Sequence, residues 1–129
     1  MKKFDEWNEV KKRTDAKDIT AHFREREIYW ANIGENIGFE QNGKGRDFIR
    51  PLLVFRKYSN NLFLGIPLST TIREGSFFFN FRFLENKESC ALLVQAKTFD
   101  AKRLDRKIGT IKQSDFQLLE LKMKELIKI

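Results

Sequence analysis

The residue of this 129-residue chain that is best suited to bind a phosphate is Arg50. It follows a loop rich in glycine and polar residues (38–48) and opens the apolar run 52–55, which is typical of a strand covered on both faces. A guanidinium stays charged at ordinary pH and can donate two parallel hydrogen bonds to phosphate oxygens. Arg50 is therefore a candidate for stabilising negative charge on a phosphate.

Ser69 and Thr70 carry hydroxyls that can assist at the same site. Both follow Pro67 at the expected end of a strand, and either hydroxyl can donate a hydrogen bond to the phosphate oxygens. Together with Arg50 they suit cleavage of RNA without a metal, in which the substrate's own 2'-hydroxyl attacks the adjacent phosphate. The protein then has to position the phosphate, stabilise charge and help protons move. The alternative interpretation is that these are ordinary surface residues at strand ends.

Other nuclease chemistries are disfavoured by the residues that are missing. His22 is the only histidine, so one chain cannot hold an acid–base pair of histidines. One histidine and one cysteine, Cys90, cannot make a structural zinc site. The stretch 43–46 lacks the spacing and the following Ser or Thr of a P-loop, and the carboxylates form no cluster typical of a two-metal nuclease. We therefore expect no metal and no cofactor.

Strand-like segments fill most of the chain after residue 25. Short apolar or alternating runs between turn residues are typical of strands. Ser59-Asn60-Asn61 fits a hairpin turn because asparagine tolerates left-handed backbone angles. The strands are expected at 28–33, 52–55, 62–68, 77–83, 91–94 and 107–111. Many short strands and a closing helix predict a mainly β fold with helices, built as a small twisted barrel.

One helix is expected at each end of the chain. Residues 3–18 carry a narrow apolar stripe with helical spacing, which suits a helix lying on a neighbouring surface. Near the C-terminus, Ser114 and Gln117 match a capping box at the start of a helix. The two apolar faces are expected to consist of Phe4, Trp7, Val10 and Thr14 in the first helix, and of Phe116, Leu119, Met123 and Leu126 in the second.

The phenylalanine-rich segment 77–83 alternates with a period of two. One face of this strand would present Phe77, Phe79, Phe81 and Phe83. Four aromatic side chains on one strand face favour a core or a dimer interface over a platform for stacking bases.

The composition predicts one basic domain without a membrane segment. Hydrophobic residues make up 41% of the chain, yet a domain this small buries only about two-thirds of its unfolded surface, so a dimer interface would help. No apolar run approaches the ~18 residues of a membrane span, no signal peptide is recognisable, and one cysteine fits a reducing, cytoplasmic compartment.

The formal net charge of +7 is unevenly distributed. Residues 1–27 hold eight Lys and Arg against seven Asp and Glu, whereas residues 28–129 hold 17 against 11. A basic body favours polyanions such as RNA, DNA or an acidic protein segment. A surface that only confers solubility is the alternative.

Several segments in this order make the chain resemble the MazF/PemK toxins of type II toxin–antitoxin systems. The resemblance covers about residues 26–127 and depends on Gly38-Phe39-Glu40-Gln41, on Arg50-Pro51 with its apolar run, on Gly65 to Thr70, on Leu93-Val94-Gln95 and on Lys97-Thr98-Phe99-Asp100 through Gly109. It implies an SH3-like barrel with a terminal helix, a homodimer, and a cognate acidic antitoxin. It also implies metal-free cleavage of single-stranded RNA to 2',3'-cyclic phosphate and 5'-hydroxyl ends.

The resemblance implies the principal catalytic role for Arg50, assisted by Ser69 or Thr70. Glu40 is the more conventional acceptor of the 2'-hydroxyl proton, because arginine is effectively always protonated in proteins and is therefore a poor base. The residues expected along the RNA path are Phe39, Gln41, Lys44, Arg46, Gln95 and Lys97. Phe39 replaces a small residue of the family pattern, and the loop 41–50 is longer than usual, so the cleavage sequence cannot be borrowed.

We expect residues 1–24 to form a helical extension and linker, and residues 25–129 to form the toxin domain. Two other functions fit the same barrel. One is a toxin that poisons DNA gyrase, since fold alone does not fix function. The other is a non-catalytic RNA-binding barrel in which Phe39 and Phe78 stack on bases.

Overall fold

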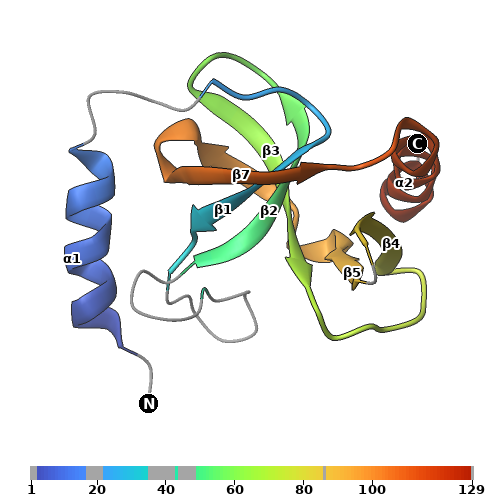
Figure 1. Ribbon diagram of the computed structural model, residues 1–129, viewed down its shortest axis with the longest axis horizontal. Coiled ribbons are helices and arrows are strands. Elements are labelled where there is room, and N and C mark those ends of the chain that lie inside the picture. Colours follow the sequence, from blue (N-terminus) through green and yellow to red (C-terminus); the bar gives the residue numbers. More distant parts are fainter. Residues whose placement is uncertain (1–2, 17–21, 35–42, 44–48, 86, 129) are drawn as a thin grey trace.

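The computed structural model describes residues 3–16, 22–34, 43, 49–85 and 87–128. These described residues form seven strands and four helical segments, and Figure 1 shows how they are arranged. In order they are α1 (Phe4–Asp15), β1 (Glu27–Asn32), β2 (Ile49–Lys57), β3 (Leu62–Ser69), β4 (Phe78–Leu84), β5 (Lys87–Leu92), the 3-10 helix η1 (Leu93–Gln95), β6 (Lys97–Asp100), the 3-10 helix η2 (Ala101–Arg103), β7 (Leu104–Thr110) and α2 (Gln113–Ile127).

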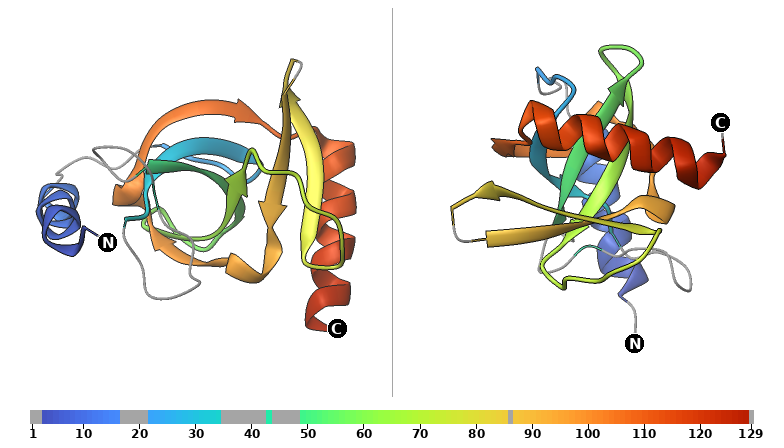
Figure 2. Two further views of the ribbon diagram at one scale, coloured as in Figure 1. Left: turned by 90° about the horizontal axis from the view of Figure 1, so that it is seen from below. Right: turned by 90° about the vertical axis from the view of Figure 1, so that its right-hand side faces the viewer.

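The strands form one curled antiparallel sheet in the order β4-β5-β3-β2-β1-β7, with β6 also paired to β3. β3 is long enough to serve two neighbours on one edge: its first half pairs with β6 and its end pairs with β5. Figure 2 shows the resulting half-barrel end-on, with α1 on one side and α2 on the other. The expected mainly β barrel with a helix at each end is confirmed.

The sheet has an apolar cluster on each face, which explains the uninterrupted apolar run in β2. Leu53 and Phe55 belong to the cluster that α2 covers, while Leu52 and Val54 belong to the cluster inside the curl. Because successive strand residues point to opposite faces, both sets are buried and the run needs no polar alternation. This confirms the prediction of a strand covered on both faces.

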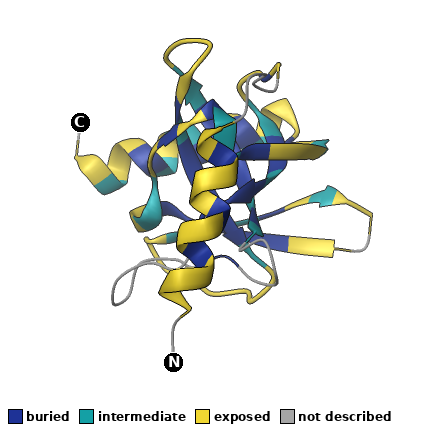
Figure 3. Cartoon of the chain, turned by 90° about the vertical axis from the view of Figure 1, so that its left-hand side faces the viewer, coloured by how far each residue is buried: buried dark blue, intermediate teal, exposed yellow. Residues whose placement is uncertain are grey.

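Helix α1 lies against the outside of the half-barrel on a narrow stripe, as its sequence predicted. Trp7, Val10 and Thr14 are buried, whereas Phe4 is 49% exposed. In Figure 3 most of α1 is coloured as exposed, and its buried residues form short segments between the exposed ones. Gly34 receives the Trp7 ring: its φ is +80°, and a Cβ at this position would lie 1.9 Å from Trp7 Cε2.

The phenylalanines of β4 pack into the core beneath α2. Phe81 is buried, Phe79 and Phe83 lie against the same cluster, and the ring centroids of Phe81 are 6.0 Å from those of Phe79 and 6.0 Å from those of Phe83. Phe77 precedes the strand and is 50% exposed, so it does not share this role. The core interpretation of this strand face is therefore confirmed for three of its four aromatic residues.

Helix α2 buries Phe116, Leu119 and Met123 as expected, but its predicted capping box is wrong. The helix begins at Gln113 after Lys112 in extended backbone, and no side chain caps its first turn. Ser114 therefore lies inside the helix rather than at its boundary. Within the described part of the chain, neither helix has the length and apolarity that a membrane span requires.

The segment 91–94 departs from the sequence expectation. β5 already begins at Lys87 and ends at Leu92, and the chain then turns into η1, which leaves Val94 54% exposed. β6 and η2 were not expected from the sequence. β6 has one buried side chain, Phe99, so it carries no clear apolar pattern.

Candidate functional site

Arg50 is the second residue of β2, at the end of the sheet where β1 and β3 both finish. Its Cα partner in β1 is Ala31, and its Nη1 donates a hydrogen bond to the carbonyl oxygen of Leu68 in β3 at 3.3 Å. The strand alternation places it on the same face as Leu52, whose side chain lies inside the curl. Arg50 is 8% exposed, so its guanidinium lies at the rim of the apolar interior.

Burial sets the electrostatics of this guanidinium. Removal from water lowers the pKa of Arg50 from its ordinary value, because burial penalises the charged form. Arginine starts so far above neutral pH that it remains a cation in proteins. A cation in a poorly solvated site attracts a phosphate more strongly than one in bulk water. The site is thus suited to stabilise negative charge on a nearby oxygen.

Ser69 is nearer to Arg50 in the strand register than Thr70 is. β2 and β3 pair Leu52 with Pro67, so continuing this antiparallel register by two residues brings Ser69 opposite Arg50. Ser69 Oγ accepts a hydrogen bond from the Thr71 N–H at 3.1 Å, and its own O–H can still act as a donor. Thr70 is exposed and follows the last residue of β3.

Gln95 and Lys97 lie along the same edge of β3. Gln95 ends η1 and is half-buried, between the β5 residues that pair with the end of β3 and the first residue of β6. Lys97 pairs with Gly65 and is exposed, with its Nζ 5.3 Å from the ring centroid of Phe99. Lys97 therefore lies beside β3, the strand that ends at Ser69, and Gln95 lies between the two strands that pair with that edge of β3.

The remaining candidates fall in the loop between β1 and β2. Glu40, Phe39, Gln41, Lys44 and Arg46 lie outside the described residues, so their roles stay predictions. Gly43 of this loop is described: it is buried, and its N–H donates to the Gly34 carbonyl oxygen at 2.7 Å. Among the residues that the structure describes, no group of three or more His, Cys, Asp or Glu side chains could hold a metal ion.

Sequence reasoning missed Arg103, a second partly buried guanidinium near the end of β1. Its Nη1 donates to the Asn32 carbonyl oxygen at 3.1 Å, and Asn32 is the Cα partner of Ile49, the residue before Arg50. Burial lowers the pKa of Arg103, while the nearby Asp100 raises it. The only sequence signal was a basic pair after Asp100, which is common on solvated surfaces.

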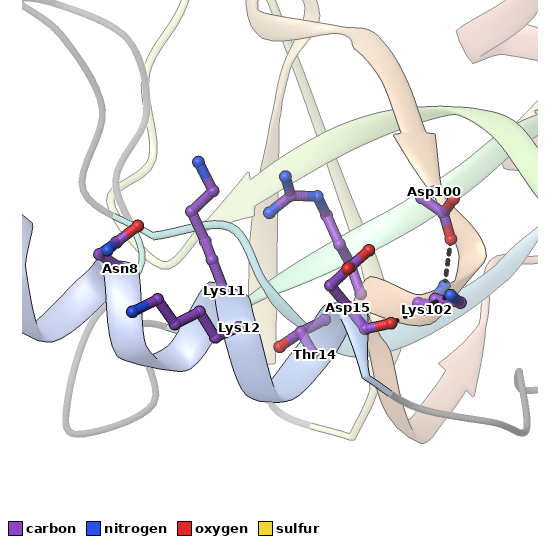
Figure 4. A pocket seen from close by; sticks show the side chains of 8 residues that line it. Asn8, Lys11, Lys12, Thr14, Asp15, Asp100 and Lys102 are labelled. Carbon is purple, nitrogen blue, oxygen red and sulfur yellow. Dashed lines mark hydrogen bonds between the residues drawn. The ribbon is translucent and has the colours of Figure 1, made fainter.

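Arg103 also lines two pockets between α1 and the barrel. The larger, of about 350 Å³, is formed by α1 and η2 (Figure 4), and the smaller, of about 170 Å³, by α1, β6 and the end of β1. The larger is lined by Asn8, Lys11, Lys12, Thr14, Asp15, Asp100, Lys102 and Arg103. The smaller is lined by Trp7, Lys11, Ile33, Lys97, Thr98, Phe99 and Arg103.

The comparison with known protein families covers nearly the whole chain after α1. Residues 24–127 match the family model described as PemK-like, MazF-like toxin of type II toxin-antitoxin system. No curated protein sequence matches the chain.

Among solved structures, MazF (form I) from Deinococcus radiodurans gives a TM-score of 0.69 at 17% identity, covering 87% of this chain and 100% of that one. The toxin MazF-mt6 of Mycobacterium tuberculosis gives 0.62 at 19% identity, covering 81% and 98%. An endoribonuclease in complex with its cognate antitoxin, from Mycobacterial species, gives 0.61 at 10% identity, covering 81% and 94%. At these identities the likeness establishes a shared fold.

Proposed function

The chain belongs to the PemK-like, MazF-like toxin family of type II toxin–antitoxin systems, and from this premise we propose that it is an endoribonuclease that cleaves single-stranded RNA without a metal ion. The observation that carries the proposal is the buried guanidinium of Arg50, which donates a hydrogen bond to the Leu68 carbonyl oxygen near the end of β3, one residue before Ser69. One of the structural relatives is itself an endoribonuclease.

In the proposed reaction the substrate's 2'-oxygen forms a bond to the adjacent phosphorus, and the bond from that phosphorus to the 5'-oxygen breaks. Arg50 stabilises the charge that develops on the non-bridging oxygens, and Ser69 donates a further hydrogen bond to them. The 2'-hydroxyl proton passes to a base, for which Glu40 is the candidate, and a proton is delivered to the departing 5'-oxygen. The products are a 2',3'-cyclic phosphate and a 5'-hydroxyl.

The direct test is cleavage of a mixed-sequence single-stranded RNA in the presence of EDTA, with the product ends identified. The wild-type protein should cut and leave 2',3'-cyclic phosphate ends. Arg50→Ala and Arg50→Lys should each lower kcat/KM by about 10²–10³-fold, because a lysine cannot bond two phosphate oxygens in parallel. Arg82→Ala, which removes an exposed arginine from β4, is the matched control.

Full activity of the Arg50→Ala variant would contradict the mechanism, because Arg50 is the residue that is proposed to stabilise most of the charge on the phosphate oxygens. A DNA-supercoiling assay beside the RNA assay addresses the gyrase alternative. Inhibition of supercoiling by a protein that leaves every RNA intact would replace the proposal by that alternative, and tight RNA binding with no cleavage would replace it by a non-catalytic RNA-binding barrel.

The proposal extends to partners and to the division of the chain. We infer that a homodimer forms, that a cognate acidic antitoxin silences it in the cytoplasm, and that residues 1–24 are an extension of the toxin domain. Two exposed leucines on α2, Leu118 at 55% and Leu121 at 58%, are available for a dimer seam. Light scattering of the purified protein measures the oligomer directly, and Leu121→Glu should shift it toward the monomer if α2 forms the seam.

A further inference from the structure

Two neighbouring pockets lie between α1, which precedes the family match that begins at residue 24, and the barrel. The two pockets described above, of about 350 Å³ and about 170 Å³, share Lys11 and Arg103 and together form what we call the α1 groove. Their combined size falls within the range of sites that hold small molecules or single nucleotides, about 300–1,000 Å³.

The charge lining the α1 groove is predominantly positive. It contains the cations of Lys11, Lys12, Lys97, Lys102 and Arg103 and the carboxylates of Asp15 and Asp100. One carboxylate is already engaged, because Asp100 Oδ1 accepts a hydrogen bond from the backbone N–H of Lys102 at 2.8 Å. A cleft lined mainly by one sign of charge concentrates ligands of the opposite sign.

Two of the basic residues in the groove are held by hydrogen bonds, and two others project from the surface of α1. Lys102 Nζ donates to the Asp15 carbonyl oxygen at 3.0 Å, and Arg103 lies 5.6 Å from the Trp7 ring centroid while bonding Asn32. These contacts hold η2 against α1 and β1. Lys11 and Lys12 are exposed residues that project from α1 (Figure 4). Lys12 forms an exposed ion pair with Glu9 at 3.4 Å, and such a pair contributes little to stability.

The smaller pocket approaches the Arg50 end of the sheet. Ile33 lines it and lies two residues after Ala31, the Cα partner of Arg50, which corresponds to roughly 7 Å along an extended strand. Lys97, the first residue of β6, lines the same pocket. From there the groove continues along α1 toward Lys12 and Lys102 in the larger pocket.

We propose that the α1 groove binds the phosphates of the RNA strand beyond the one held by Arg50, so that α1 adds a second anchoring site to the substrate path. This inference rests on the proposed endoribonuclease function. It favours RNA over a docked acidic peptide because the apolar lining residues Trp7, Ile33 and Phe99 are all at most 6% exposed. An ordered peptide needs accessible apolar pockets for its anchors, whereas a phosphate backbone needs cations alone.

The test measures RNA affinity with the Arg50→Ala protein, so that binding is read without cleavage. Two single-stranded RNAs of about 6 and about 16 nucleotides bracket the site sizes of ordinary single-strand binders. The Lys11→Gln/Lys12→Gln pair is compared with the Lys3→Gln/Lys124→Gln pair, which removes the same charge from the residue before α1 and from α2, outside the groove. Glutamine keeps a helix propensity close to that of lysine.

The Lys11→Gln/Lys12→Gln pair should lower the ratio of long-RNA to short-RNA affinity by about tenfold, and should make the slope of log affinity against log salt shallower by about 1.4, from a factor of 0.7 per phosphate contact. The control pair should leave that ratio within about twofold of the parent. Equal loss on both RNAs, or equal loss in both pairs, overturns the groove assignment. A selective loss of affinity for a polyglutamate peptide, with RNA binding intact, overturns it in favour of a protein partner.

Failure of the proposed function is separable from failure of this inference. If the wild-type protein cuts no RNA but the length-dependent loss is observed, the groove stands as an RNA site and the endoribonuclease assignment falls. If the wild-type protein cuts RNA and the ratio does not change, only the groove assignment falls.

Discussion

At the scale of single residues, Arg50 illustrates why a buried cation is informative. Enclosing a guanidinium costs free energy unless its donors are satisfied, and the Leu68 carbonyl oxygen accepts one hydrogen bond from Arg50. A purely structural side chain at the start of a strand could be apolar. Retaining a charge there is typical of sites where that charge acts on a ligand.

We expect Ser69→Ala to lower kcat by about 10–100-fold, because a hydrogen bond to a charged group contributes about 1.5–3 kcal/mol. Thr70→Val should lower kcat by less than about threefold, since Thr70 lies beyond the strand register that brings Ser69 opposite Arg50. Steady-state kinetics on one RNA measures both. The reverse order of effects would transfer the role to Thr70, and thermal denaturation checks that loss of the Ser69–Thr71 bond has not loosened the loop.

Glu27 should make the fold more stable at neutral pH than in acid. Burial alone would raise its pKa, but hydrogen bonds from Lys107, the Arg24 N–H and Tyr29 lower it overall. Lys107 Nζ lies 2.8 Å from Oε2, and the Arg24 nitrogen lies 2.7 Å from Oε1. A lowered folded-state pKa means that this stabilisation is present above the unfolded value, near 4.5, and is lost as pH falls through the folded value.

Glu27→Gln should therefore lower the free energy of unfolding by about 1–2 kcal/mol at pH 7. The loss should become progressively smaller as the pH falls below the pKa of the Glu27 carboxyl in the unfolded chain. Urea unfolding at a series of pH values measures the difference. Glu88→Gln, at an exposed position of β5, is the matched control. A Glu27→Gln deficit that stays constant down to acid pH would mean that packing, rather than ionisation, carries the contribution.

At the scale of elements, one of the contacts between α1 and the barrel is the close approach of the Trp7 ring to Gly34. The Trp7 ring occupies the space that a side chain at position 34 would need, and the positive φ of Gly34 favours glycine independently. These two constraints are separable, because the first disappears when the ring is removed and the second does not.

Gly34→Ala should lower stability by about 2–4 kcal/mol, from overpacking against Trp7 together with left-handed backbone strain. In a Trp7→Ala background the same substitution should cost only the strain, about 1–2 kcal/mol. A double-mutant cycle by urea unfolding measures the difference. Equal costs in both backgrounds would show that α1 does not hold its ring on Gly34 in solution.

The sequence predicts elements well where burial is periodic and poorly where it is not. The segments 28–33 and 62–68 match β1 and β3 within one residue at each end because their apolar residues fill one or both faces. β6 was not predicted because Phe99 is its only buried residue. The prediction of a cap at Ser114 was wrong because a local motif does not determine the residue at which α2 begins. At the site, Arg50 could be singled out because an apolar run follows it in the sequence. Arg103 could not, because its contact with Asn32 joins residues 71 positions apart and leaves no local sequence pattern.

At the scale of the whole molecule, the positive charge is concentrated outside the first 27 residues, where 17 Lys and Arg oppose 11 Asp and Glu. Helix α1 still contributes to the field, because its near-balanced charges are arranged so that Lys11 and Lys12 face the groove that η2 and β6 complete. The placement of the basic residues on the surface therefore matters for binding polyanions, in addition to the net charge of +7.

RNA binding by the Arg50→Ala protein should weaken steeply with salt. If four phosphates are neutralised, the slope of log affinity against log salt is about −2.8, which lowers affinity about 50-fold between 50 and 200 mM salt. Fluorescence anisotropy across this range measures the slope. A polyanionic ligand that displaces counterions must show this dependence, whereas binding dominated by base stacking changes little with salt. A slope near zero with tight binding would therefore mean that exposed aromatic side chains, and not the basic surface, hold the strand.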